Sequence, residues 1–178
     1  MSVLQAKALA KFGDNISTDD MTPGKYLTSH LPADLGAICM RELDPDFPQK
    51  MSPGGFVVGG MNFGCGSSRE TAAIALKACN VKGILAGEYA RIFYRNCINI
   101  GIPLMECPNY GKIDVGDDLI VDFETGKVEN LTKNETYQST PIPAFLMDKI
   151  EAGGLLEVLE KRLGEQKKQE DENGTYGN

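Results

Sequence analysis

Between residues 56 and 105, short apolar runs alternate with segments of helical periodicity. The pattern predicts strands at 56–59, 81–86 and 102–105, separated by helices at 68–79 and 88–97. Strands that alternate with helices of about ten residues are typical of β-α-β units, in which neighbouring strands are parallel and the crossovers are right-handed. We therefore expect the middle of the chain to form a parallel sheet with flanking helices.

The two ends of the chain carry different patterns. Residues 3–12 alternate and predict a first strand, whereas residues 44–55 predict an irregular connection with room for a short helix. After Pro108, short strand candidates follow one another with a turn at 124–127, as in antiparallel hairpins. These candidates lie at 112–115, at 118–123, at 128–131 and near Tyr137.

A last helical stretch opens at Pro143, where a proline suits the first turn. Its apolar positions follow the i, i+3, i+4, i+7 rule at Ala152, Leu155, Leu156, Leu159 and Leu163, and Gly153-Gly154 is expected to break or kink it. Residues 164–178 contain mainly Gln, Lys, Glu, Asp, Asn and Gly and are expected to form a disordered polar tail. Together the patterns predict one α/β domain over residues 1–163.

Composition narrows the classes of partner. The 178 residues are 42% hydrophobic and 24% charged, with a net charge of -7. An acidic chain argues against a nucleic-acid or anionic-membrane partner, and no apolar run reaches the roughly 18 residues that a spanning helix needs. The first twelve residues lack the pattern of a signal peptide. We therefore expect a cytoplasmic protein.

The cysteines and the histidine limit the chemistry of the chain. The five cysteines at 39, 65, 79, 97 and 107 form no C-x-x-C or His-paired pattern, so we expect no metal site in this chain and mostly buried thiols in a reducing compartment. Cys65 is the exception, because its place before a predicted helix could make it reactive. His30 is the single histidine, so any Ser-His hydrolase mechanism within this chain would have to use it.

A glycine-rich loop at residues 64–70 (Gly-Cys-Gly-Ser-Ser-Arg-Glu) carries the strongest functional signal. It lies between a predicted strand and a predicted helix, where free amides and the helix dipole favour an anion. Arg69 adds a planar fork that suits a carboxylate or a phosphate, and Ser67 sits where an ionised oxygen would be stabilised. A purely structural alternative is a capping box, in which Ser67 and Glu70 satisfy each other's backbone amides.

Residues 62–70 (Asn-Phe-Gly-Cys-Gly-Ser-Ser-Arg-Glu) resemble the signature of the small swivelling domain of the aconitase superfamily. More narrowly, they are similar to the free-standing small subunits of 3-isopropylmalate dehydratase and its relatives. Three further segments match that family in order, at 14–20, at 89–96 and at 142–145 with 153–155. The match spans roughly residues 5 to 163, and it departs at Thr71-Ala72-Ala73, where many relatives have His-Ala-Pro.

The resemblance implies a β/β/α swivelling fold, with a mixed sheet, flanking helices and a C-terminal β-hairpin and helix extension. It also implies a hydro-lyase subunit that works with a separate large subunit carrying a 4Fe–4S cluster. By motif, Ser67 would be the base that removes a proton from the substrate, and Asp19 with Thr18 would help to orient the site. Arg69 would bind a substrate carboxylate, beside Ser68 and Gly66. From the residues alone, the preferred interpretation of Asp19 is an N-cap or part of an Asx-turn.

The loop Tyr26-Leu27-Thr28-Ser29 is expected to choose the substrate. In relatives, an arginine directly after the leucine goes with a substrate that bears an extra carboxylate, and a larger apolar residue there goes with a branched alkyl group. Thr28 offers no cation, so a third carboxylate would lose its solvation without a partner. The expected substrate is a dicarboxylate: 3-isopropylmalate first, then dimethylmalate or citramalate, with homocitrate-type tricarboxylates (a homoaconitase) last.

Two readings from other classes remain open at this point. The loop could hold a phosphate in a stand-alone anion-binding regulatory module, or Ser67 could be the nucleophile of a hydrolase.

Overall fold

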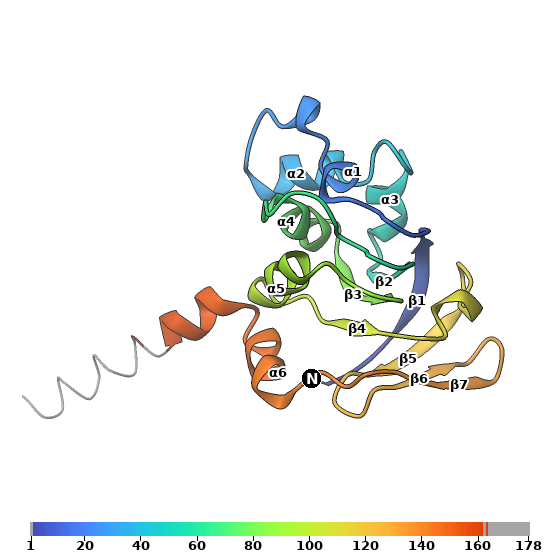
Figure 1. Ribbon diagram of the computed structural model, residues 1–178. Coiled ribbons are helices and arrows are strands. Elements are labelled where there is room, and N and C mark those ends of the chain that lie inside the picture. The colour runs from blue at the N-terminus through green and yellow to red at the C-terminus, as the bar shows by residue number, and fades with distance from the viewer. Residues whose placement is uncertain (1, 162, 164–178) are drawn as a thin grey trace, which may run out of the picture.

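The computed structural model describes residues 2–161 and 163, and Figure 1 shows a curled mixed sheet with helices packed around it. The strands have the order β4-β3-β2-β1-β5-β6-β7 in one seven-stranded sheet. They span β1 (Val3–Lys11), β2 (Gly55–Gly59), β3 (Val81–Ala86), β4 (Leu104–Glu106), β5 (Asp118–Asp122), β6 (Lys127–Asn130) and β7 (Glu135–Gln138). The helices are α1 (Thr18–Met21), α2 (Pro32–Ile38), α3 (Phe47–Met51), α4 (Thr71–Ala78), α5 (Arg91–Asn99) and α6 (Ala144–Glu151), with short 3-10 turns at Gly24–Tyr26 and Tyr110–Lys112.

Strand β1 belongs to both halves of the sheet. Its first five residues, from Val3 to Lys7, pair antiparallel with β5, and its later residues, from Ala8 to Lys11, pair parallel with β2. The register shifts between Ala8 and Ala10, where the pairing passes from one neighbour to the other. The parallel half β4-β3-β2-β1 and the antiparallel half β5-β6-β7 are therefore joined through one continuous strand.

The buried side chains form two clusters on opposite faces of the sheet. All five residues of β2 are buried; Val57 belongs to the cluster beneath the helices, whereas Phe56 and Val58 face the cluster formed with β5, β6 and α6. A strand that is covered on both faces is expected to be apolar at every position, as this one is. The glycine-rich loop leaves the end of this strand, so it starts from one of the best-packed parts of the molecule.

The α/β fold expected from the sequence is confirmed; the differences are shifted helix starts, one expected strand that does not form and one helix that the sequence did not predict. Helix α4 begins at Thr71, three residues later than expected, and α5 begins at Arg91 rather than at 88. The strand expected at 112–115 is wrong: a 3-10 turn ends at Lys112, and the chain then reverses before β5. Helix α2 was not expected, because its sequence lacks a side-chain N-cap and a periodic apolar face.

The C-terminal stretch is interrupted at the two glycines, as expected. Gly153 and Gly154 adopt positive φ values of 96° and 138°, and a second helical segment covers residues 155–161. Within residues 2–161 and 163, no helix is long and apolar enough to cross a membrane. The disordered tail expected at 164–178 lies outside the described residues.

A buried carboxylate supports the turn before β5. Asp117 accepts hydrogen bonds from the Asp114 N–H at 2.9 Å and from Nδ2 of Asn130 at 2.6 Å, and Lys133 Nζ lies 3.3 Å away. Burial by itself would raise the pKa of Asp117, but these donors together hold it below its ordinary value. The ionised form of Asp117 is therefore part of the folded structure.

Asp117→Asn should flatten the acid limb of the stability profile. Because the folded pKa is lowered, the unfolded chain binds this proton more tightly, so the stabilisation is present above about pH 4 and is lost as the pH falls through the folded pKa. Urea unfolding from pH 2 to 7 measures the slope. Asp46→Asn, at an exposed position with no ion pair to any described residue, is the matched control. An equal slope below pH 4 for wild type and Asp117→Asn would contradict the assignment.

Candidate functional site

Two segments about 47 residues apart in the sequence lie side by side as a short parallel ladder. Its three backbone hydrogen bonds run from Asn15 N to Met61 O, from Gly64 N to Ile16 O and from Thr18 N to Cys65 O, with lengths of 2.7 to 2.8 Å. This pairing sets the start of α1 directly against the glycine-rich loop. The candidate residues of both segments therefore share one place at the C-terminal end of β2.

Glycines allow the loop to bend without strain. Gly64 and Gly66 have φ values of 81° and 93°, a region that side chains disfavour. A Cβ at Gly64 would also overlap the ring of Phe93 on α5. The close approach of α5 to the loop thus depends on a glycine at this position.

The capping-box interpretation of Ser67 and Glu70 is wrong. Helix α4 starts at Thr71 with Glu70 as its N-cap, and no side chain caps it. A capping box does exist, but it lies at α1: Ser17 Oγ accepts from the Asp20 N–H at 3.1 Å, and Asp20 Oδ2 accepts from the Ser17 N–H at 2.8 Å. Asp19 is therefore not the N-cap of α1, and its carboxylate is available for another partner.

Arg69 contacts two other candidate residues, Ser67 and Asp19. Its Nε–H donates to Ser67 Oγ at 3.0 Å, and its Nη2 forms an ion pair with Asp19 Oδ1. The Arg69 backbone N–H also points to Ser67 Oγ at 3.3 Å. Ser67 Oγ thus accepts from two donors, one of them cationic, an arrangement that favours negative charge on the oxygen.

Threonine hydroxyls hold the loop backbone. Thr18 Oγ1 accepts from the Ser67 N–H at 3.1 Å and lies 3.2 Å from the Ser67 carbonyl, so it brackets the peptide on both sides of that residue. Thr22 Oγ1 donates to the Thr18 carbonyl at 3.2 Å and lies 3.2 Å from the hydroxyl of Thr71. Thr71, the first residue of α4, thereby extends the series of hydroxyl contacts from α4 to α1.

Asn96 is a contributor that the sequence argument missed. It is a buried side chain on α5, and its Nδ2 donates to the carbonyl of Ser68 at 3.3 Å. Its place within the matching segment 89–96 was visible in the sequence, but the contact with residue 68 depends on how α5 packs on the loop.

Arg69 lies near Gly24, just before the loop Tyr26–Ser29, but the described contacts of the loop's own side chains do not reach Arg69. A side chain built at Gly24 would lie 3.9 Å from Nη1 of Arg69. The Tyr26 hydroxyl instead donates to Glu42 at 2.7 Å, and Leu27 packs against the core. Thr28 is exposed and Ser29 accepts from the Leu31 N–H at 3.1 Å, so these two residues present polar groups at the rim.

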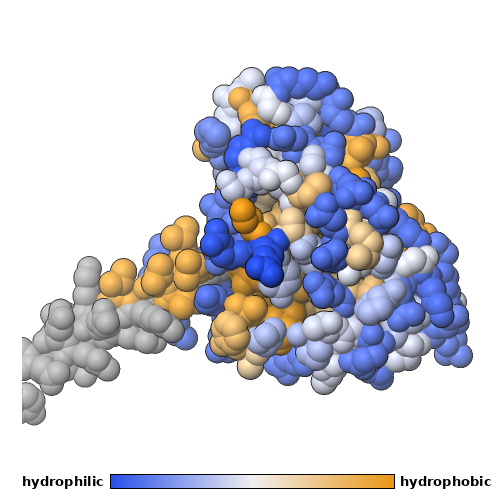
Figure 2. All heavy atoms as spheres, viewed as in Figure 1, coloured by the Kyte–Doolittle hydropathy of each residue, from blue (hydrophilic) through white to orange (hydrophobic). Residues whose placement is uncertain are grey.

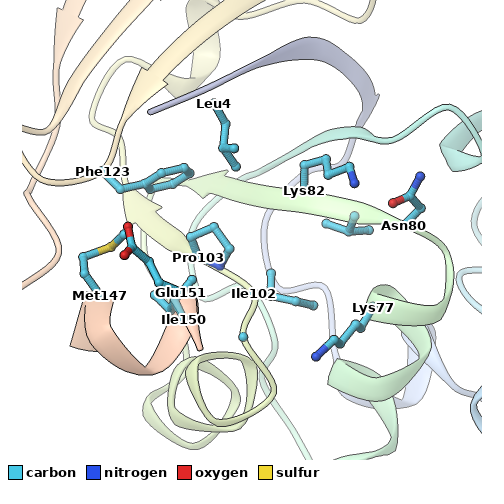
Figure 3. Close-up of a pocket in the computed structure, with 12 residues that line it drawn as sticks. Leu4, Lys77, Asn80, Lys82, Ile102, Pro103, Phe123, Met147, Ile150 and Glu151 are labelled. Atoms are coloured by element: carbon cyan, nitrogen blue, oxygen red, sulfur yellow. The ribbon is translucent and has the colours of Figure 1, made fainter. Parts of the chain in front are cut away.

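The site is an open surface rather than a cavity. The Arg69 and Asp19 side chains are 44% and 60% exposed. A cavity of about 420 Å³ lies elsewhere, near the N-terminal ends of β3 and β4, on the opposite edge of the parallel strands (Figure 3). Figure 3 shows Met147 and Glu151 of α6 on one side of that cavity and Lys77 and Lys82 on the other. It shares no residue with the candidate site.

The donor chemistry of the described residues does not fit a metal centre. In residues 2–161 and 163, no three His, Cys, Asp or Glu side chains converge to hold an ion. All five cysteines are free thiols; burial raises the pKa of Cys39, Cys97 and Cys107, whereas Cys65 is half-buried beside the Asn15 carbonyl. Among the described contacts, Ser67 Oγ is hydrogen-bonded to Arg69 and has no bond to His30.

The chain is similar to known proteins over most of its length. Residues 44–109 match the aconitase C-terminal domain. The chain is 48% identical to the 3-isopropylmalate dehydratase small subunit of Methanosarcina acetivorans, covering 87% of this chain and 96% of that protein. It is 47% identical to the isopropylmalate/citramalate isomerase small subunit of Methanocaldococcus jannaschii, covering 87% and 93%.

A solved structure has the same fold. The crystal structure of a 3-isopropylmalate dehydratase from Methanocaldococcus jannaschii superposes with a TM-score of 0.87 at 38% identity, covering 94% of this chain and 99% of that one. Identity at this level over nearly the whole chain, together with the aconitase-type loop between β2 and α4, shows that the chain belongs to the family of 3-isopropylmalate dehydratase small subunits, the hydro-lyase subunits of the aconitase superfamily.

Proposed function

We propose that the chain is the small subunit of a two-subunit 3-isopropylmalate dehydratase, in which Ser67 is the base and a large subunit carries a 4Fe–4S cluster. The observation that carries this proposal is the contact of Arg69 with both Ser67 Oγ and Asp19. The relatives' names, which specify a small subunit, support a large partner. Free thiols in every cysteine agree with a reducing, cytoplasmic setting.

Ser67 would remove the proton from the carbon next to the one that bears the hydroxyl. The electron pair of that C–H bond becomes the double bond, and the hydroxide leaves from the neighbouring carbon. A serine is a very poor base in water, so its ionised form needs several kcal/mol of stabilisation from oriented donors. The Arg69 Nε–H and backbone N–H supply two such donors in this chain. When bound by the partner, the cluster would supply a Lewis acid for the leaving hydroxide.

Arg69 would also bind one carboxylate of the substrate. Asp19 holds Nη2, so the orientation of the guanidinium is set before the substrate arrives. Thr18 holds the Ser67 backbone against the start of α1, which fixes the position of Ser67 relative to Asp19. The exposure of both side chains means that the dry environment this chemistry needs must come from the partner.

A serine hydrolase or a stand-alone anion-binding module is favoured by no contact of the site. In a hydrolase, Ser67 would need a general base that accepts its proton. The side chain that contacts its hydroxyl is Arg69, which is a cationic hydrogen-bond donor. A stand-alone module should bind phosphate without a partner, which equilibrium dialysis of the isolated chain measures.

Ser67→Ala should remove turnover and leave the fold intact. Loss of a general base costs about 10²- to 10⁴-fold in kcat. The stability cost should be about 1 kcal/mol, because the hydroxyl accepts only local hydrogen bonds. Turnover is measured anaerobically after mixing with the cluster-loaded large subunit of the same organism, with Ser52→Ala, at an exposed serine, as the matched control. Near-normal turnover by Ser67→Ala, or turnover by the chain alone without iron, would overturn the proposal.

Arg69→Lys and Asp19→Asn should separate binding from orientation. A lysine cannot copy the fork that reaches a carboxylate with two N–H groups, so Arg69→Lys should mainly raise KM, by about tenfold or more. Asp19→Asn keeps the shape and loses the ion pair, so kcat should fall more than KM rises. Steady-state kinetics of the reconstituted enzyme measures both. An unchanged KM in Arg69→Lys would show that another group binds the carboxylate.

Thr28→Arg should shift the preference toward tricarboxylates. The wild type should prefer 3-isopropylmalate, then a methylated malate, then homocitrate, because Thr28 gives a third carboxylate no charged partner. A guanidinium at this position should raise the relative kcat/KM for homocitrate by about 10- to 100-fold, as expected for one charged hydrogen bond. Thr136→Arg, on the exposed face of β7, is the control. A wild-type preference for the tricarboxylate would show that another residue or the large subunit supplies the charge.

A further inference from the structure

The leucine-rich helical segment that follows Gly154 leaves its apolar face uncovered by the other described residues. Leu156, Leu159 and Leu163 are 72%, 44% and 57% exposed, although their spacing is that of a helix with one buried side. Figure 1 shows this segment extending away from the body beyond α6, and Figure 2 shows its apolar side chains gathered in an otherwise largely polar view. Contiguous exposed apolar surface of this kind marks a binding surface.

The segment forms one wall of a groove of about 380 Å³, which we call the leucine groove. Its apolar lining is contributed by Pro32, Ile74, Ile100, Leu155 and Leu156. Glu70, Lys77 and Glu157 add charged groups to the lining. The groove therefore combines an apolar floor with a polar edge, the arrangement of a protein–protein interface.

The base of the leucine-rich segment is held firmly to the domain. Lys77 Nζ donates to the carbonyls of Gly153 and Ile100, and the Gly154 N–H donates to the Lys149 carbonyl at 3.0 Å. The backbone of Gly101 also packs closely on Gly153, where a Cβ would overlap it. The exposed leucines are thus presented from a fixed base.

The leucine groove adjoins the glycine-rich loop at residues 64–70. One of its lining residues, Glu70, follows Arg69 in the sequence, and another, Pro32, lies three residues beyond Ser29. Leu31, which links that loop to the groove, is 65% exposed. A partner that covers Ser67 and Arg69 can therefore extend past Glu70 into the groove.

The chemistry of the alternatives leaves one occupant. Residues 164–178 are polar or glycine apart from Tyr176, so the chain's own tail offers little apolar surface. A second copy in the groove would lie beside the catalytic loop, where the substrate needs the large subunit. We propose that the leucine groove, together with the exposed leucines of the adjoining segment, is a docking site for the large iron–sulfur subunit, anchored by Leu156 in the groove and by Leu159 beside it; this rests on the proposed two-subunit function.

The test compares binding and turnover in the same variants. Leu156→Glu and Leu159→Glu should each raise the Kd for the cluster-loaded large subunit of the same organism by about 30-fold or more, the effect of losing an interface anchor. At saturating small subunit their kcat should stay near wild type.

Two control variants accompany them. Val115→Glu, at a 59% exposed valine in the turn before β5, should leave the Kd unchanged. Ser67→Ala should bind normally and lose turnover. Anaerobic biolayer interferometry gives the Kd, and thermal melts by circular dichroism confirm folding, with Leu156→Ser as the milder variant.

Each outcome decides between the two proposals. Weak binding by both leucine variants, with normal binding by Val115→Glu, supports the docking site. Equal Kd values for all variants, with an active wild type, overturn the docking site and leave the proposed function standing. A wild-type chain that neither binds the large subunit nor turns over overturns both. A wild-type dimer in sedimentation that Leu156→Glu dissolves, without a change in Kd for the large subunit, assigns the groove to a second copy and overturns the docking site.

Discussion

Arg69 donates to Ser67 with Nε and forms an ion pair with Asp19 through Nη2, and the rest of the site is arranged so that one side chain can make both contacts. The two partners are 48 residues apart in the sequence, so the contact requires the ladder between residues 15–18 and 61–65. It also depends on the capping box of Ser17 with Asp20. Because the Asp20 carboxylate accepts from the backbone at the start of α1, the Asp19 carboxylate is available to pair with Arg69. An exposed ion pair adds little to stability. Its value here is positional.

The sheet explains why the two segments of the site are aligned with each other while their side chains remain exposed to a partner. Strand β1 pairs with β2 over its second half and leads directly into the segment that carries Thr18 and Asp19, while β2 leads directly into the glycine-rich loop. Parallel strands end at the same edge, so both segments emerge together. The strands β5-β6-β7, which belong to the same curled sheet, and helix α6 form a second core on the other face of the parallel strands. The chemistry is thereby placed on the edge of a well-packed element and faces outward.

The proposed role of Ser67 has a consequence for the surface around the site. The Arg69 fork and the Asp19 carboxylate are solvated in the isolated chain, and a strong base on Ser67 needs water to be excluded. The leucine groove includes Glu70, the residue that follows Arg69, in its lining, and Leu156 exposes apolar surface there. A partner that buries the apolar residues would dry the polar ones by the same contact. Binding of the large subunit would then both complete the assembly and exclude water from Ser67 and Arg69.

The sequence by itself determined the α/β class, the alternation of strands and helices from β2 to β4, the hairpins that follow and the break at Gly153-Gly154, because these depend on local periodicity and on glycine and proline. It also pointed to Ser67, Arg69 and Asp19 through the motif. It could not determine where α4 begins, so Ser67 and Glu70 resembled a capping box that does not form. Only the tertiary structure decided that Asp19 pairs with Arg69, that Asn96 holds Ser68 and that Leu156 and Leu159 stay exposed. Each of these depends on how segments far apart in the chain pack against one another, which local spacing cannot encode.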